Sequence, residues 1–165
     1  VKPAELAAWI VEGRADYRLI DLRTADEFAA YHIPTAENAE LTALTEYPLL
    51  RNEKIVLYSE GGIHSAQAWL LLRAQGYEGV YTVLGGLDGW KDEVLFPVLP
   101  ADASARDRAQ FERAAALAQF FGGQPRAGGA AAAEAPATAL PKLTAPAATG
   151  PAVPGAPRKK KKEGC

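Results

Sequence analysis

The chain has 165 residues and a mass of 17.5 kDa, which suits one domain with an appendage and excludes two full domains. Hydrophobic residues make up 48% and charged residues 23%, as in globular rather than fibrous proteins. Residues 1–100 hold eight Lys/Arg and fifteen Asp/Glu, whereas residues 101–165 hold ten and five. We therefore expect an acidic domain followed by a basic tail. Because no apolar run approaches about 18 residues, no transmembrane helix is expected.

Two features of the chain ends constrain its chemistry. The chain opens at Val1 and contains no methionine, so we expect a processed product; its compartment is cytoplasmic or, if an export signal was removed, periplasmic. Cys165 is the only cysteine, which excludes an intramolecular disulfide and a multi-cysteine zinc site. We expect no metal and no cofactor.

Strand and helix patterns alternate in the first half of the domain. Residues 4–10 have the spacing of a short amphipathic helix, and the apolar run at residues 17–22 predicts a buried strand. Thr24 then begins a second helix, with Glu27 in the capping-box position. A weaker extended segment and a short helix are predicted at residues 36–39 and 41–47.

The second half repeats this alternation. Residues 54–58 (KIVLY) are the strongest predicted strand, and a helix over residues 65–75 follows it. The last strand spans residues 80–84 and leads into the glycine-rich segment 85–90 and a short helix. Strands separated by helices of this length predict an α/β fold with a mostly parallel sheet covered on both faces.

The remaining chain divides into two parts. Residues 103–121 have the pattern of a helix whose apolar side docks on the domain. The following residues are almost entirely Ala, Pro, Gly and Thr, which offer too little apolar surface to offset the entropy of ordering. We therefore predict a domain at residues 1–100, a docked helix at 101–122 and a disordered linker at 123–165 that ends in KKKKEGC.

The loop after the strongest strand is the best candidate for a binding site. In α/β proteins, ligands bind where a parallel strand ends and a helix begins. Successive backbone N–H groups between Ser59 and Ser65 can form a concave site for an anion, helped by the dipole of the following helix. The predicted loop consists of Ser59, Glu60, Gly61, Gly62, Ile63, His64 and Ser65.

Four segments, in order, resemble the signatures of rhodanese-like domains, a sulfurtransferase family: residues 19–23 (LIDLR), 32–36 (HIPTA), 59–65 (SEGGIHS) and 85–90 (GGLDGW). The resemblance implies a five-stranded parallel sheet with helices on both faces. It also implies a loop whose first residue, a cysteine, carries sulfane sulfur as a persulfide and whose last residue is basic. Ser59 and His64 stand in those two positions, at the rhodanese spacing and one residue closer than in related phosphatases.

Both substitutions bear on activity. A persulfide needs an accessible thiolate, and a serine hydroxyl neither ionises readily near neutral pH nor carries sulfur. We therefore expect Ser59 to be inactive and the domain to bind a small anion such as thiosulfate, or a persulfide-bearing partner, without catalysis. An imidazole at residue 64 would gain and lose its charge near pH ~6.5, which would make anion binding pH-dependent.

Other candidate residues have simpler interpretations. Ser59 and His64 lack the surrounding motif of a serine hydrolase. Asp21 and Arg23 resemble a buried network at a strand end, and His32 resembles the family's structural histidine.

Cys165 provides the alternative to a non-catalytic module. A flexible linker of about 43 residues has a root-mean-square span of ~36 Å, so the tail thiol can reach the loop and act there as a sulfur carrier. The other interpretation is an incidental terminal residue beside a solubilising lysine run. Four lysines without interleaved aromatic residues give little support for binding to nucleic acid or an acidic surface.

Overall fold

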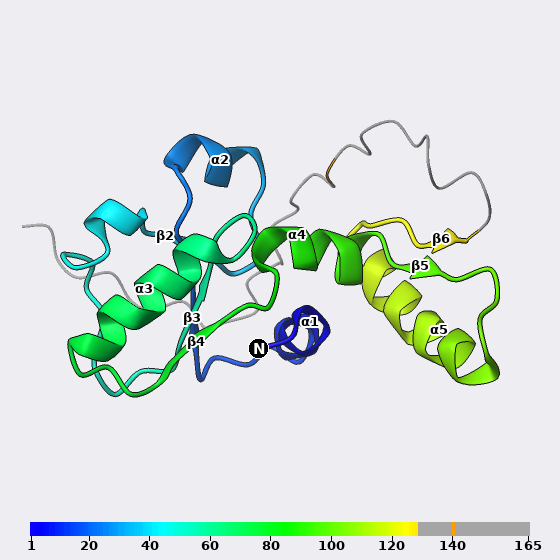
Figure 1. Cartoon of the computed structure of the whole chain (residues 1–165), viewed down its shortest axis with the longest axis horizontal. Coiled ribbons are helices and arrows are strands. Elements are labelled where there is room, and N and C mark those ends of the chain that lie inside the picture. The colour runs from blue at the N-terminus through cyan, green and yellow to red at the C-terminus, as the bar shows by residue number, and fades with distance from the viewer. Residues whose placement is uncertain (129–139, 141–165) are drawn as a thin grey trace, which may run out of the picture.

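A four-stranded parallel sheet forms the centre of the domain in the computed structural model, which describes residues 1–128 and 140 (Figure 1). Its order is β2-β1-β3-β4. The strands are β1 (Arg18–Asp21), β2 (Glu37–Asn38), β3 (Ile55–Tyr58) and β4 (Val80–Thr82). The prediction of an α/β fold with a parallel sheet is confirmed.

Within the described residues the sheet has four strands instead of the expected five. Val1 lies along the free edge of β4: its amino group donates to the Thr82 carbonyl at 2.8 Å, and its carbonyl accepts from the Leu84 N–H at 2.9 Å. This alternation is the bonding pattern of a parallel strand. It involves a single residue because Pro3 follows closely and begins α1 (Pro3–Val11), which leaves no extended segment to continue the pairing.

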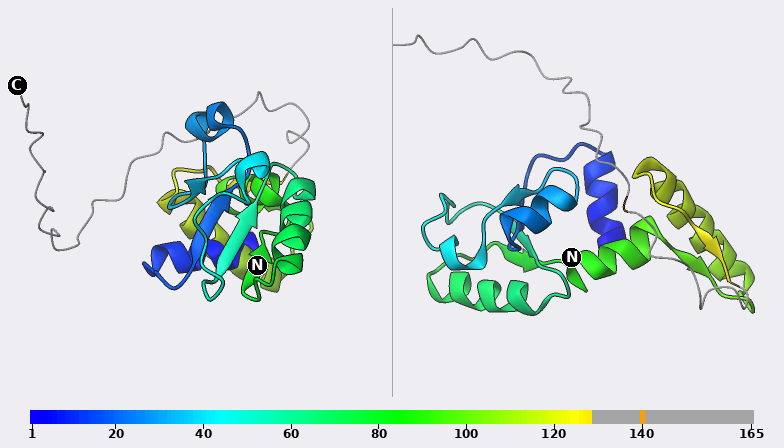
Figure 2. Two further views of the ribbon diagram at one scale, coloured as in Figure 1. Left: turned by 90° about the vertical axis from the view of Figure 1, so that its left-hand side faces the viewer. Right: turned by 90° about the horizontal axis from the view of Figure 1, so that it is seen from above.

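Helices cover both faces of the sheet, and side chains of the central strands alternate between two cores. On one face, α1, α4 (Gly86–Trp90) and the π-helical turn η2 (Lys91–Leu95) pack against Leu19, Val56 and Tyr58. On the other, α3 (Ile63–Ala74) packs against Ile20, Ile55 and Leu57. Figure 2 shows the arrangement from two further sides.

Two segments between the strands differ in regularity. Helix α2 (Ala25–Ala30) begins where predicted, because Thr24 and Glu27 form the expected capping box. The helix predicted at residues 41–47 is only the 3-10 turn η1 (Leu41–Ala43), which continues in turns up to Pro48.

A C-terminal unit extends from one end of the domain (Figure 1). Helix α5 (Ala105–Phe120) contacts the first core near its C-terminal end, through Leu117 and Phe121. A short parallel pair joins β5 (Val98–Leu99) to β6 (Arg126–Ala127). Strand β6 lies within the predicted linker: the Arg126 N–H donates to the Pro97 carbonyl at 2.9 Å, and the N–H of the next residue after the strand, Gly128, donates to the Leu99 carbonyl. The rest of that predicted linker, residues 129–139 and 141–165, lies outside the described residues.

Candidate functional site

The loop between β3 and α3 is built on a buried serine. Ser59 follows β3 directly and is 1% exposed, and its Oγ accepts a hydrogen bond from the Ser65 N–H at 3.3 Å. The Ser65 hydroxyl donates to the Gly62 carbonyl at 2.8 Å. Gly62 has φ +96°, a conformation that favours glycine and turns the chain into the helix. The loop therefore closes on itself around the Ser59 hydroxyl.

The second glycine-rich segment, residues 85–90, donates two hydrogen bonds to the backbone of this loop. The Leu87 N–H donates to the Ser59 carbonyl at 2.8 Å, and the Asp88 N–H donates to the Glu60 carbonyl at 3.0 Å. The segments at residues 59–65 and 85–90 are thus joined by hydrogen bonds at the carboxyl edge of the sheet.

The loop amides are free to bind a ligand. The N–H groups of residues 60–64 have no hydrogen-bond acceptor among the residues that the structure describes. Ile63 and His64 begin α3, where the N–H groups lack intrahelical partners and the helix dipole favours negative charge. Residues 60–64 therefore present five consecutive neutral N–H donors that can bind an anion.

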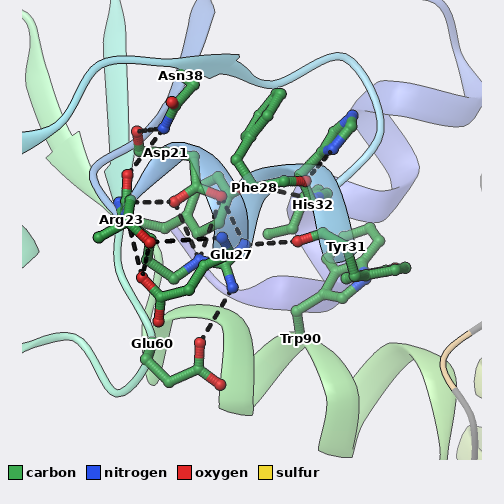
Figure 3. Close-up of polar contacts among 12 residues, drawn as sticks. Asp21, Arg23, Glu27, Phe28, Tyr31, His32, Asn38, Glu60 and Trp90 are labelled. Carbon is green, nitrogen blue, oxygen red and sulfur yellow. Dashed lines mark hydrogen bonds and ion pairs between the residues drawn. The ribbon is translucent and has the colours of Figure 1, made fainter.

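The side-chain cations beside the loop are already paired, and Figure 3 shows the partners of Arg23. Arg23 binds Asp21 at 2.7 Å and the Tyr31 carbonyl at 2.6 Å, and it reaches the Glu60 carboxylate at 3.2 Å. Lys91 binds the other oxygen of Glu60 at 2.6 Å. Partial burial of Glu60 would raise its pKa, but the two cations outweigh that effect and lower it. Glu60 thus remains charged and neutralises both neighbours.

The basic residue of the loop, His64, lies at a cavity beside the loop. His64 is exposed and lines a cavity of about 330 Å³ whose wall also contains Arg23, Glu27, Glu40 and Glu60. His64 makes no hydrogen bond to Ser59 among the described contacts, so the two do not form a nucleophile–base pair.

The predicted network residues separate into two groups. Asp21 and Arg23 form a buried pair that extends to the loop through Glu60. His32 stands apart from this pair: its ring stacks on Phe28 with centroids 3.9 Å apart, and its Nδ1 lies 2.9 Å from the Phe28 carbonyl (Figure 3). Cys165 lies outside the described residues.

Sequence reasoning missed Lys91. Its only signal was its position directly after the segment at residues 85–90, and its pairing with Glu60 depends on how α4 crosses the end of β3. The part of the chain that the structure describes holds no cluster of three potential metal ligands, and none of its helices is long and apolar enough to cross a membrane.

The comparisons with known proteins agree with this geometry. The pattern of the rhodanese-like domain matches residues 2–93. The thiosulfate sulfurtransferase GlpE of Coxiella burnetii is 29% identical over 90 residues, covering 53% of this chain and 84% of the relative. The uncharacterized protein YqhL of Bacillus subtilis is 34% identical over 88 residues, covering 50% and 70%.

Solved structures show the same fold. The crystal structure of a rhodanese-like domain protein from Staphylococcus aureus matches with a TM-score of 0.51 and 27% identity, over 56% of this chain and 91% of that one. The crystal structure of the Alr3790 protein from Anabaena matches with a TM-score of 0.53 and 26% identity, over 55% and 75%. With the family pattern covering more than half of its length, this chain belongs to the rhodanese-like domain family.

Proposed function

We propose that this chain is a non-catalytic rhodanese-like module that binds a small anion such as thiosulfate, or the persulfide of a partner protein, at the loop of residues 59–65. The observation that carries the proposal is that the N–H groups of residues 60–64 have no acceptor among the described residues and directly follow a buried serine, where the family has a cysteine. The relative GlpE is named a thiosulfate sulfurtransferase, which supports thiosulfate as the probe.

The chemistry of sulfur transfer explains why binding and catalysis separate here. In the transfer, a thiolate attacks the outer sulfur of thiosulfate, the S–S bond breaks, and sulfite leaves with the bonding electrons. Cyanide then removes the sulfur from the persulfide as thiocyanate and restores the thiolate. Ser59 cannot take the thiolate's part, because its hydroxyl is far from ionised at neutral pH and forms no stable persulfide equivalent.

The test is thiosulfate-to-cyanide sulfur transfer by the full chain. We expect the unchanged protein and Cys165→Ser to be inactive and Ser59→Cys to form thiocyanate, because the loop supplies everything except the thiol. Ser59→Ala is the matched control, since it changes the same buried position without adding sulfur. The far-ultraviolet circular dichroism of each variant shows whether the domain has folded.

The alternative function assigns the thiol to Cys165, and what favours it is that this cysteine is the only one in the chain. It predicts activity in the unchanged protein and none in Cys165→Ser. Activity that survives in Cys165→Ser would contradict both functions. An inactive but folded Ser59→Cys would remove the claim that the loop is intact as a sulfur site.

A further inference from the structure

The carboxylates around the loop have the same sign of charge as the anion that the loop is proposed to hold. Arg23 and Lys91 are the two permanent cations that reach the loop, and Glu60, a residue of the loop itself, binds both. The side chain of Arg23 is 7% exposed and also donates to the Asp21 carboxylate and the Tyr31 carbonyl, so it is not available to a ligand. Lys91 also lies 3.4 Å from Asp88. No permanent cation among the described residues at the loop is left without a carboxylate.

Further carboxylates add to this imbalance. Glu27 and Glu40 line the cavity next to the loop together with Glu60. The Asp88 carboxylate lies 3.7 Å from the point where a side chain would begin at Gly61. Among the described residues around the loop, these four carboxylates face two permanent cations, Arg23 and Lys91, and the imidazole of His64. The loop therefore offers neutral N–H donors within a negative surrounding potential.

Such a site discriminates by the number of charges on the ligand. Hydrogen bonds from the loop amides favour any compact anion, whereas the repulsion from the surrounding carboxylates grows in proportion to the ligand's charge. We infer that the loop selects singly charged anionic groups over free dianions, and that Glu60 is the residue that sets this preference. The inference rests on the proposed function and specifies the ligand class of the same site.

Two probes of nearly equal shape isolate the effect. Thiosulfate is a dianion, and methanethiosulfonate is the same group with one oxygen replaced by a methyl group, which leaves a single negative charge. Their dissociation constants are measured by following the amide signals of the full chain by NMR, at constant ionic strength because salt screens these interactions. We expect the unchanged protein to bind methanethiosulfonate at least as tightly as thiosulfate.

Glu60→Gln removes one negative charge and the carboxylate partner of Lys91, whereas Arg23 stays bound to Asp21 and the Tyr31 carbonyl. We expect about threefold tighter binding of methanethiosulfonate and about tenfold tighter binding of thiosulfate, because the Coulomb energy doubles with the ligand's charge. The matched control is Glu112→Gln, which makes the same change of residue and net charge on an exposed position of α5. It should leave both constants unchanged.

A second variant reverses the sign and guards against loss of folding in the first. Lys91→Gln leaves Glu60 with only Arg23 as a partner, so thiosulfate should bind more weakly, by a larger factor than methanethiosulfonate. Equal factors for the two probes, or effects no larger than those of Glu112→Gln, would overturn the role of Glu60 and leave the proposed function intact. Failure of both probes to shift the amides of residues 60–64 in any of the proteins would overturn the proposed function as well.

Discussion

Gly86, in the second glycine-rich segment, packs closely against the backbone of the loop at residues 59–65. Its φ of +59° lies in the left-handed region, and a Cβ built on it would lie 2.5 Å from the Glu60 carbonyl and 3.0 Å from the Gly62 nitrogen, with the Ser59 carbonyl closer still. All three neighbours are backbone atoms, which cannot rotate out of the way. Gly86→Ala must therefore either displace the loop or distort the start of α4.

Gly13 provides a matched comparison for the size of this effect. Its φ is +66°, and nothing lies within 4 Å of the Cβ position. Gly13→Ala should cost only the left-handed strain, about 1–2 kcal/mol in the free energy of unfolding. Gly86→Ala carries the same strain and an overlap with fixed backbone that adds roughly 1–3 kcal/mol, for a total of about 2–5 kcal/mol.

Urea denaturation followed by circular dichroism measures both costs, and an unchanged slope with denaturant shows that the comparison is valid. Gly86→Ala should also weaken thiosulfate binding, because the amides of residues 60–64 move with the loop, whereas Gly13→Ala should not. If the two alanine variants lose equal stability and bind thiosulfate equally well, close packing of Gly86 does not position the loop, and the reasoning fails.

Two other predictions concern separate parts of the domain. Tyr31→Phe removes the buried hydroxyl that accepts from Trp90 Nε1 at 3.1 Å, so urea denaturation should show a loss of about 1–3 kcal/mol; no loss would mean that the indole finds another acceptor. The Arg18 guanidinium lowers the pKa of Glu37, so this pair stabilises the fold above the carboxyl's unfolded pKa of about 4.5, and the gain is lost as the pH falls through the lower folded value. Glu37→Gln should therefore flatten the decrease in the free energy of unfolding between about pH 6 and pH 3.5, and an equally steep decrease would contradict this role.

The central strand and its loop were predictable because both depend on local sequence. Residues 55–58 of the predicted strand 54–58 are apolar without interruption, as a strand buried on both faces requires, and the structure contains β3 at Ile55–Tyr58. Gly61 and Gly62 allow the turn that follows, and α3 begins within two residues of the predicted position. The approach of Arg23 to the loop also follows from parallel pairing, which brings the ends of β1 and β3 to the same edge.

The remaining features depend on pairings between distant residues. Strand β6 consists of two residues, Arg126 and Ala127, in a segment whose composition resembles a linker, and it forms because β5 lies beside it. The missing fifth strand follows from the single residue that pairs with the β4 edge before α1 begins. Neither feature has a periodic pattern that could identify it in the sequence.

The electrostatic environment of the loop depends on ion pairs that the composition of the chain does not reveal. The basic residues Arg23, His64 and Lys91 near a glycine-rich loop would be taken as an anion-attracting cluster if each were counted by its charge alone. The structure gives two of them carboxylate partners and places the third over a cavity with an acidic wall. What remains to attract an anion is the backbone itself, whose donors are neutral. The sequence therefore predicts an anion-binding loop, whereas the preference that we propose among anions depends on the ion pairs of Glu60, which only the structure shows.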